Sequence, residues 1–215
     1  MSGVLEAITR WWESLTGSPA GFFNFSFLPK YWLYFRQGIG MTLLLSVAAV
    51  ALAVLPALAL ALMRMSKRRL PRWIAGAYIA VFRSTPMLVQ LSLVYFGLFS
   101  AIRLPNVQLF GFVKFSMFLP CVVCLALNSA AYVAEIFRAG IQAVDRGQSE
   151  AARSLGLSRG QALRLVVLPQ AVKNILPALA GEVVTMVKES SICSMLGMEE
   201  LMFGAKAVAS ATYVS

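Results

Sequence analysis

Two acidic residues stand inside an apolar segment near the end of the chain, where a charge is costly. Glu182 and Glu189 lie seven residues apart in LPALAGEVVTMVKESSICSMLG, so a helix would place both on one face. Ionisable groups in membrane segments are functional candidates by default, and paired carboxylates could bind a cationic group. The alternative is structural: Glu189 and Lys188 lie near the membrane edge, and Glu182 pairs with a basic residue such as Arg83.

Uncharged polar side chains interrupt two other apolar segments. Thr85, Gln90 and Asn128 are weaker binding candidates, since Asn128 can instead hydrogen-bond a neighbouring helix. Glu135 and Arg138 are three residues apart, and this spacing predicts a local ion pair.

Cys121 and Cys124 form a C-x-x-C pair, a spacing found in redox and metal sites. The setting, LPCVVCLALN, is apolar, and the chain has no histidine to complete a zinc site of four ligands. We therefore predict buried apolar cysteines here, the same environment for Cys193, and no metal site.

The composition indicates what kind of protein positions these groups. The chain of 215 residues is 59% hydrophobic and only 13% charged, whereas soluble domains are about a quarter charged. The fold class is therefore an all-α integral membrane protein. A net charge of +10 would suggest nucleic acid in a soluble chain. Here the basic residues flank apolar runs, so we expect them to set orientation in the membrane and expect no nucleic-acid partner.

The uncharged runs define the spans. A helix needs about 20 residues to cross the hydrocarbon core, and 27, 19 and 20 uncharged residues follow Arg36, Arg83 and Lys114 in turn. A fourth, less pure run contains the two glutamates. The expected spans are 38–63, 84–102, 115–135 and 174–196. Residues 1–37 are expected to form an external or interfacial segment, because Val4, Ile8 and Trp11 follow helical spacing on one face.

Orientation follows from the basic residues. The connections after the first and third expected spans are rich in arginine and lysine, whereas the connection between the second and third holds only Arg103 and Lys114. Both basic connections are therefore expected in the cytoplasm, with the N-terminus outside.

The segment 149–170 is a polar hairpin between two apolar runs. Ser149 is expected to cap a first helix and Gly156 to end it in a left-handed conformation. Ser158 and Gln161 have the spacing of a capping box that starts a second helix, which should end before Pro169. Three interpretations remain at this point: a DNA-binding helix-turn-helix, an inert connector, and an element that docks a partner protein.

The hairpin also resembles a known family. Glu150-Ala151-Ala152, Gly156 and Leu168-Pro169 resemble the EAA loop of ABC importer permeases of type I. FRSTPMLVQL, AAYVAEIFRAGIQAVDRGQSEAARSLGLS and LPALAGEVVTMVKESSICSMLG resemble its polar amino-acid branch, of the histidine, glutamine, glutamate and arginine type. The likeness extends over about residues 38–212, the expected transmembrane domain.

The resemblance implies a role and partners. Such a permease pairs with an identical or similar permease, binds cytoplasmic ATPase subunits that hold ATP and magnesium, and receives an amino acid from an external binding protein. The implied coupling residues are Glu150, Ala151, Ala152, Leu155, Gly156, Leu157 and Pro169. The chain lacks a G-x-x-x-x-G-K-[ST] phosphate loop, so we expect no ATP hydrolysis and no cofactor of its own.

Two expectations complete this interpretation. The protein should be a multi-pass component of a bacterial inner membrane, and its alternative is a stand-alone ion-coupled carrier or channel, in which inverted repeats are common. Relatives usually have one further span beyond the last residue here, so the final span is expected to be missing from this chain.

Overall fold

The computed structural model describes residues 2–16, 27–102, 104–105, 107–109 and 113–212. Within these residues the secondary structure is helical apart from one two-stranded ribbon, and short turns and loops join the elements. The elements are α1 Ser2–Thr16, α2 Leu28–Met65, α3 Arg69–Ser84, α4 Met87–Ser92, the π-helix η2 Leu93–Phe99, β1 Gln108–Leu109, β2 Val113–Lys114, α5 Phe115–Gln142, α6 Arg146–Ser154, α7 Arg159–Ala162, the π-helix η3 Leu163–Val167, α8 Leu168–Glu189, the 3-10 helix η4 Ser190–Leu196 and α9 Leu201–Thr212.

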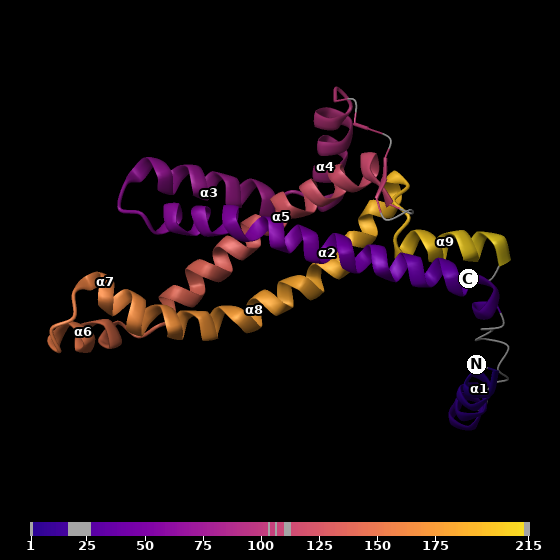
Figure 1. Cartoon of the computed structure of the whole chain (residues 1–215), viewed down its shortest axis with the longest axis horizontal. Helices are drawn as coiled ribbons and strands as arrows, with labels where there is room; N and C mark the ends of the chain where they lie inside the picture. The colour runs from indigo at the N-terminus through magenta and orange to yellow at the C-terminus, as the bar shows by residue number, and fades with distance from the viewer. Residues whose placement is uncertain (1, 17–26, 103, 106, 110–112, 213–215) are drawn as a thin grey trace.

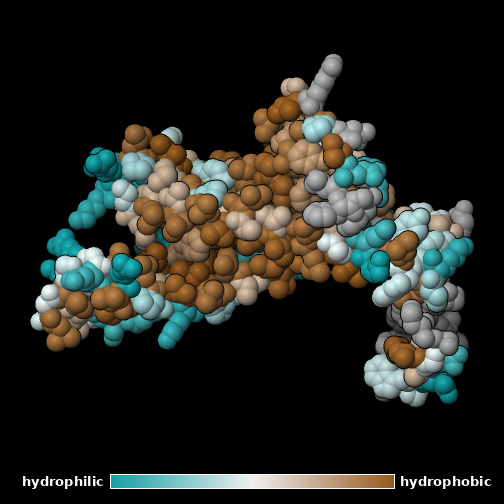
Figure 2. Space-filling model, viewed as in Figure 1, coloured by the Kyte–Doolittle hydropathy of each residue, from teal (hydrophilic) through white to brown (hydrophobic). Residues whose placement is uncertain are grey.

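The long helices lie along one axis of the molecule. Figure 1 shows α2, α5 and α8 extending along this axis, with α3 returning beside α2. The hairpin of α6 and α7 lies at the same end as the turn between α2 and α3, and α9 lies at the opposite end beside the start of α2. Apolar residues cover the middle of the body in Figure 2, and hydrophilic residues gather towards its two ends. This distribution suits a protein that crosses a membrane along its long axis.

In the described part of the chain, three helical stretches are long and apolar enough to cross a membrane: Leu28–Met65, Phe115–Gln142 and Arg159–Leu196. The bent pair of helices at Arg69–Ser84 and Met87–Phe99 supplies a fourth if it counts as one span. The all-helical membrane fold expected from composition is thus confirmed. The first spanning helix, α2, begins at Leu28, well before residue 38, where the first span was expected to start.

The second apolar segment differs from the single helix expected over 84–102. α3 ends at Ser84, and the axis then bends by 106° before α4 begins at Met87. Pro86 explains the break, because a proline disfavours helical angles in the residue before it, and Thr85 has φ −104° and ψ 140°. Arg83 consequently ends one helix and does not begin a span.

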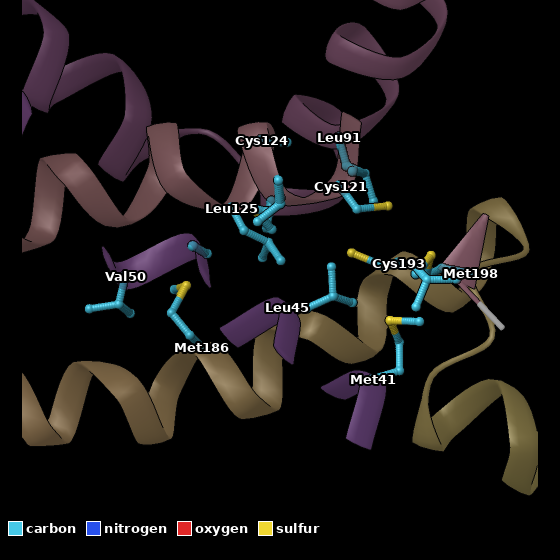
Figure 3. Packing of buried hydrophobic residues seen from close by; sticks show 14 residues of the cluster. Met41, Leu45, Val50, Leu91, Cys121, Cys124, Leu125, Met186, Cys193 and Met198 are labelled. Atoms are coloured by element: carbon cyan, nitrogen blue, oxygen red, sulfur yellow. The ribbon is translucent and has the colours of Figure 1, made fainter. Parts of the chain in front are cut away.

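A stripe of buried residues on α2, all small except Met41 and Leu45, packs into the core. Its buried face repeats about every four residues, which keeps one side of a helix towards its partner. The members of this stripe are Gly38, Met41, Leu45, Ala49, Ala53, Ala57 and Ala61. Alanine and glycine allow close approach of helix backbones in a membrane, and α2 packs along α5. In Figure 3, Met41 and Leu45 point towards the apolar cluster that also holds Cys121, Cys193 and Met198.

The cysteines lie where the sequence predicted. Cys121, Cys124 and Cys193 are completely buried and form no disulfide. Among the residues that the structure describes, no three cysteine, aspartate or glutamate side chains meet in a way that could hold a metal ion.

A buried carboxylate fixes α9 to α2. Glu200 is 1% exposed, receives a hydrogen bond from the Thr42 hydroxyl at 3.3 Å, and accepts the Phe203 backbone N–H at 2.8 Å. Thr42 Oγ1 in turn accepts the Leu201 N–H at 3.2 Å, so the first turn of α9 is capped from two sides. Gly38 allows the close approach, because a Cβ there would lie 2.8 Å from the Leu201 Cα.

The ribbon at this end carries an ion pair. Lys114 Nζ lies 2.8 Å from Glu199 Oε1, and this hydrogen bond holds the pKa of Lys114 above its ordinary value. Arg103, the other basic residue of this connection, lies outside the described residues.

Candidate functional site

The polar hairpin is held in shape by its own caps. α6 begins four residues earlier than expected: its N-cap is Asp145, whose Oδ1 accepts the Gly147 N–H at 2.6 Å, and Ser149 lies inside the helix. The prediction of a Ser149 cap was wrong because Asp145, just after the end of α5, supplies an earlier acceptor.

The turn after α6 has the predicted left-handed glycine. Gly156 has φ +88°, and the Leu157 N–H reaches back to the Ala152 carbonyl at 3.2 Å. The Gly156 N–H also bonds the Arg153 carbonyl at 3.0 Å, which gives the pattern of a Schellman motif. This pattern fixes the direction in which the chain leaves α6.

The predicted capping box is also present. The Gln161 N–H bonds Ser158 Oγ at 3.3 Å, and the Ser158 N–H bonds Gln161 Oε1 at 2.9 Å. Buried Ala152 and Ala162 mark where the short helices pack, and Gln170 Nε2 donates to Gln148 Oε1 at 3.3 Å. Hydrogen bonds therefore stabilise the hairpin internally and also connect it to the start of α8.

The predicted end of the second helix before Pro169 was wrong. α7 continues through the π-helix η3 into α8 without leaving helical angles, and Leu168 has φ −61° and ψ −43°. Pro169 lies in the first turn of α8, where the wider π turn upstream removes the need for a proline N–H.

The tip of the hairpin is apolar and exposed. Leu155 is 85% exposed, Leu157 is half-buried, and Glu150 and Ala151 lie on the exposed side of α6. A leucine exposed to this degree beside a rigid glycine turn is suited to fill a groove in a partner.

A second polar group lies at the bend between α3 and α4. Gln90 Nε2 donates to the Phe82 carbonyl at 2.8 Å and to the carbonyl and hydroxyl of Thr85 at 3.0 and 2.7 Å. Asn128 Nδ2 then donates to Gln90 Oε1 at 3.0 Å. Gln90 thus bonds backbone carbonyls that lose their helical partners at the break between α3 and α4. Asn128 connects this bend to α5 through its bond to Gln90.

The two glutamates of α8 lie near this cluster. Ser129 Oγ donates to Glu182 Oε1 at 2.9 Å, and Glu182 is 6% exposed. Among the described residues Glu182 forms no ion pair with Arg83, so that structural alternative is not borne out. Two buried acceptors, Asn128 Oδ1 and Glu189 Oε2, have no hydrogen-bond partner in the described part of the chain. Sequence reasoning missed Ser129, although its position next to Asn128 in an apolar span was a signal.

An open cavity of about 420 Å³ lies between α3, α5 and α8. Its polar lining comes from Arg83, Tyr132, Glu135, Asn174 and Glu182, and the rest of the wall is apolar. The predicted pair of Glu135 and Arg138 is confirmed, with Arg138 Nη2 lying 2.6 Å from Glu135 Oε2.

Comparison with known proteins agrees with this architecture. The family model described as "Binding-protein-dependent transport system inner membrane component" matches residues 49–208. The arginine transport system permease protein ArtQ of Bacillus subtilis is 42% identical over 180 residues, which are 84% of this chain and 78% of ArtQ. The octopine transport system permease protein OccM of Rhizobium meliloti is 39% identical over 188 residues, 87% of this chain and 76% of OccM. A crystal structure of an amino acid ABC transporter with histidines matches with a TM-score of 0.77 and 47% identity, over 88% of this chain and 84% of that chain.

Proposed function

This chain belongs to the family of inner-membrane components of binding-protein-dependent transport systems, and on that basis we propose that it imports polar amino acids with energy from a separate ATPase. The observation that carries the proposal is the rigid hairpin of α6 and α7, which ends in the exposed side chain of Leu155. The amino-acid class is supported by the names of the similar permeases and of the similar solved transporter.

The hairpin is the proposed docking element for the ATPase. Leu155, Gly156 and Leu157 enter a groove of the ATPase, and Glu150 pairs with a basic group beside it. Ala151 and Ala152 let α6 lie close to its neighbours, and Pro169 starts the helix that carries the motion into the membrane. Because the caps fix the angle between α6 and α7, displacement of the hairpin moves α8 as one body.

The proposed orientation places the hairpin and the turn between α2 and α3 in the cytoplasm. That turn and its flanks contain Arg64, Lys67, Arg68, Arg69 and Arg72, which the positive-inside rule assigns to the cytoplasmic side. The start of α2 and all of α9 then face outwards, towards the external binding protein. α1 lies at the external surface of the inner membrane, where its exposed side chains Val4, Ile8 and Trp11 contact lipid.

The proposed substrate contacts centre on α8. Glu182 is an acceptor that suits an ammonium or guanidinium group, and so are Glu189 Oε2 and Asn128 Oδ1, which have no hydrogen-bond partner among the described residues. Thr85 and Gln90 hold the bend that shapes this region, so their role is to position Asn128. A second permease subunit, identical or similar, forms the other wall of the pathway.

The test is purification of the protein from its native membrane in mild detergent, followed by identification of co-purifying proteins. We expect an ATP-binding cassette ATPase with the wild-type chain and its loss with Leu155→Ser. The matched control is Leu70→Ser, because Leu70 is also exposed, at 69%, near the same end of the molecule but outside the hairpin. An intact wild-type protein without an ATPase contradicts the proposal and favours a stand-alone carrier.

A further inference from the structure

The turn between α2 and α3 combines unpaired positive charge with exposed apolar side chains. Four basic residues fall within six positions of the sequence, and all four are exposed. In the described part of the chain none of them forms an ion pair, and the first turn of α3 holds no acidic residue. A leucine and a tryptophan lie among them, 69% and 71% exposed. The residues of this surface, called the basic patch below, are Lys67, Arg68, Arg69, Leu70, Arg72 and Trp73.

We propose that the basic patch binds the headgroup of an anionic phospholipid in the membrane leaflet that this end of the molecule reaches. Arginine donates paired hydrogen bonds to a phosphate group, and tryptophan favours the boundary between membrane and water. The two features together identify a lipid, since positive charge alone would suit any acidic surface. The site does not depend on the proposed import function, because it uses none of the residues proposed to bind the ATPase or the substrate.

Helical periodicity separates the charged and apolar sides of the patch. Leu70 and Trp73 lie on the face of α3 opposite buried Ala75, so they point away from the protein. Arg69 and Arg72 are three residues apart and therefore lie side by side on the flank of this face. Like charges at this spacing repel each other, and a bound anion removes the repulsion. The patch thus presents a cationic pair beside an apolar surface, which matches a phosphate group above acyl chains.

The patch lies at the level where lipid headgroups are expected. The 27 uncharged residues of α2 end directly before Arg64, and the patch begins three residues later. Figure 2 shows apolar residues over the middle of the body and hydrophilic residues towards its ends. A membrane that covers the apolar middle therefore has its headgroups beside this turn.

Contacts within the protein hold the turn in one shape. The Ser66 N–H bonds the Met63 carbonyl at 3.2 Å, and Ser66 Oγ accepts the Arg68 N–H at 3.2 Å. Arg64 lies across Gly76 of α3, with its Nη1 3.4 Å from the position that a Cβ would take there. Because the backbone is already ordered, little of the attraction between the patch and a lipid is spent on ordering it.

The test measures which lipid surrounds Trp73. The other three tryptophans of the chain lie in α1 and near the start of α2, and the changes Trp11→Phe, Trp12→Phe and Trp32→Phe leave Trp73 alone. This protein is reconstituted in vesicles with equal amounts of phosphatidylcholine and phosphatidylglycerol. One lipid at a time carries bromine, which quenches tryptophan fluorescence on contact. The two quenching levels give the ratio of the binding constants of the two lipids at the patch.

The expected ratio follows from the charge of the patch. A basic residue beside an anionic membrane surface strengthens binding about fivefold, so we expect phosphatidylglycerol to be favoured about 5- to 25-fold. Arg69→Gln combined with Arg72→Gln should lower this ratio at least about fivefold. Arg69→Lys combined with Arg72→Lys keeps the charge and should keep most of the preference. Sodium chloride should weaken the preference by screening.

The matched control is Arg164→Gln combined with Lys173→Gln. It removes two exposed basic residues from η3 and the start of α8, which lie at the same end of the molecule but outside the patch (Figure 1). This pair should keep the full preference, and an equal fall in the control overturns the site. Equal quenching by the two lipids around the unchanged patch also overturns it.

Two further outcomes would assign the patch to another ligand. Inorganic phosphate that lowers the preference more than sodium chloride of the same ionic strength would show a site for free phosphate and overturn the lipid site. Loss of a co-purifying ATPase from native membranes with Arg69→Gln and Arg72→Gln would show a protein contact and overturn it as well.

Discussion

Gly156 offers the sharpest test of how the hairpin works. Its φ of +88° costs an L-residue roughly 1–2 kcal/mol. No atom of the described residues lies within 4 Å of the position that a Cβ would take. A substitution therefore meets backbone strain and no steric clash in the isolated chain. We expect Gly156→Ala to lower the population of the docking conformation about tenfold, because 1.4 kcal/mol corresponds to a factor of ten. Gly156→Ile should lower it further, since β-branched residues are rare at positive φ.

The assay is titration of the purified permease with its ATPase, with the dissociation constant as the readout. Gly156→Asn should lie closest to wild type, because asparagine tolerates the left-handed region. The matched control is Gly160→Ala in the same hairpin: it also has open space around it, but it lies in helical α7, where alanine is favourable. Unchanged ATPase affinity in Gly156→Ile, or an equal loss of affinity in Gly160→Ala, would show that the left-handed turn at Gly156 does not set the docking conformation.

Three further predictions concern the rest of the molecule. Gly38→Ala should destabilise the protein by about 1–3 kcal/mol in thermal unfolding, since its Cβ would lie 2.8 Å from the α9 backbone. Gly40→Ala should not, because no described atom lies within 4 Å of the Cβ position there. The ion pair of Lys114 raises the pKa of its ammonium group, so its stabilisation is full below the unfolded pKa near 10.5 and is lost as pH rises through the higher folded value. Unfolding midpoints of wild type should therefore exceed those of Lys114→Met by a constant amount below pH 10.5 and approach them as the pH rises above that value, and a difference that does not shrink there would contradict this. In intact cells an impermeant maleimide should label Gln108→Cys but not Ser154→Cys, and the reverse pattern would invert the proposed orientation.

Local patterns predicted the hairpin well. The left-handed Gly156 and the capping box of Ser158 and Gln161 depend on residues close in sequence, and both are present as expected. The predicted start of α6 was four residues too late, because Asp145 and Ser149 are both favourable N-cap residues. α5 ends at Gln142, so Asp145 is the first of the two that the chain reaches. The prediction that the helix ends before Pro169 was wrong because a π turn upstream lets the helix continue, and no sequence periodicity predicts such a turn.

Long-range contacts were beyond sequence reasoning. Composition and uncharged runs predicted a membrane protein, but they could not show that Gln90 bridges a broken helix or that Ser129 bonds Glu182. The cap that Thr42 and Glu200 build across more than 150 residues had no local signal. Such groups become evident only when the helices are placed side by side, because each satisfies a partner on another element.

The most direct test of ATP-driven import is uptake of a labelled polar amino acid into proteoliposomes that contain the purified permease complex. We expect accumulation that requires internal ATP and the external binding protein, and no accumulation when the ATPase is left out. Uptake that proceeds without ATP, driven by an ion gradient alone, would contradict ATP-driven import and identify the chain as a stand-alone carrier.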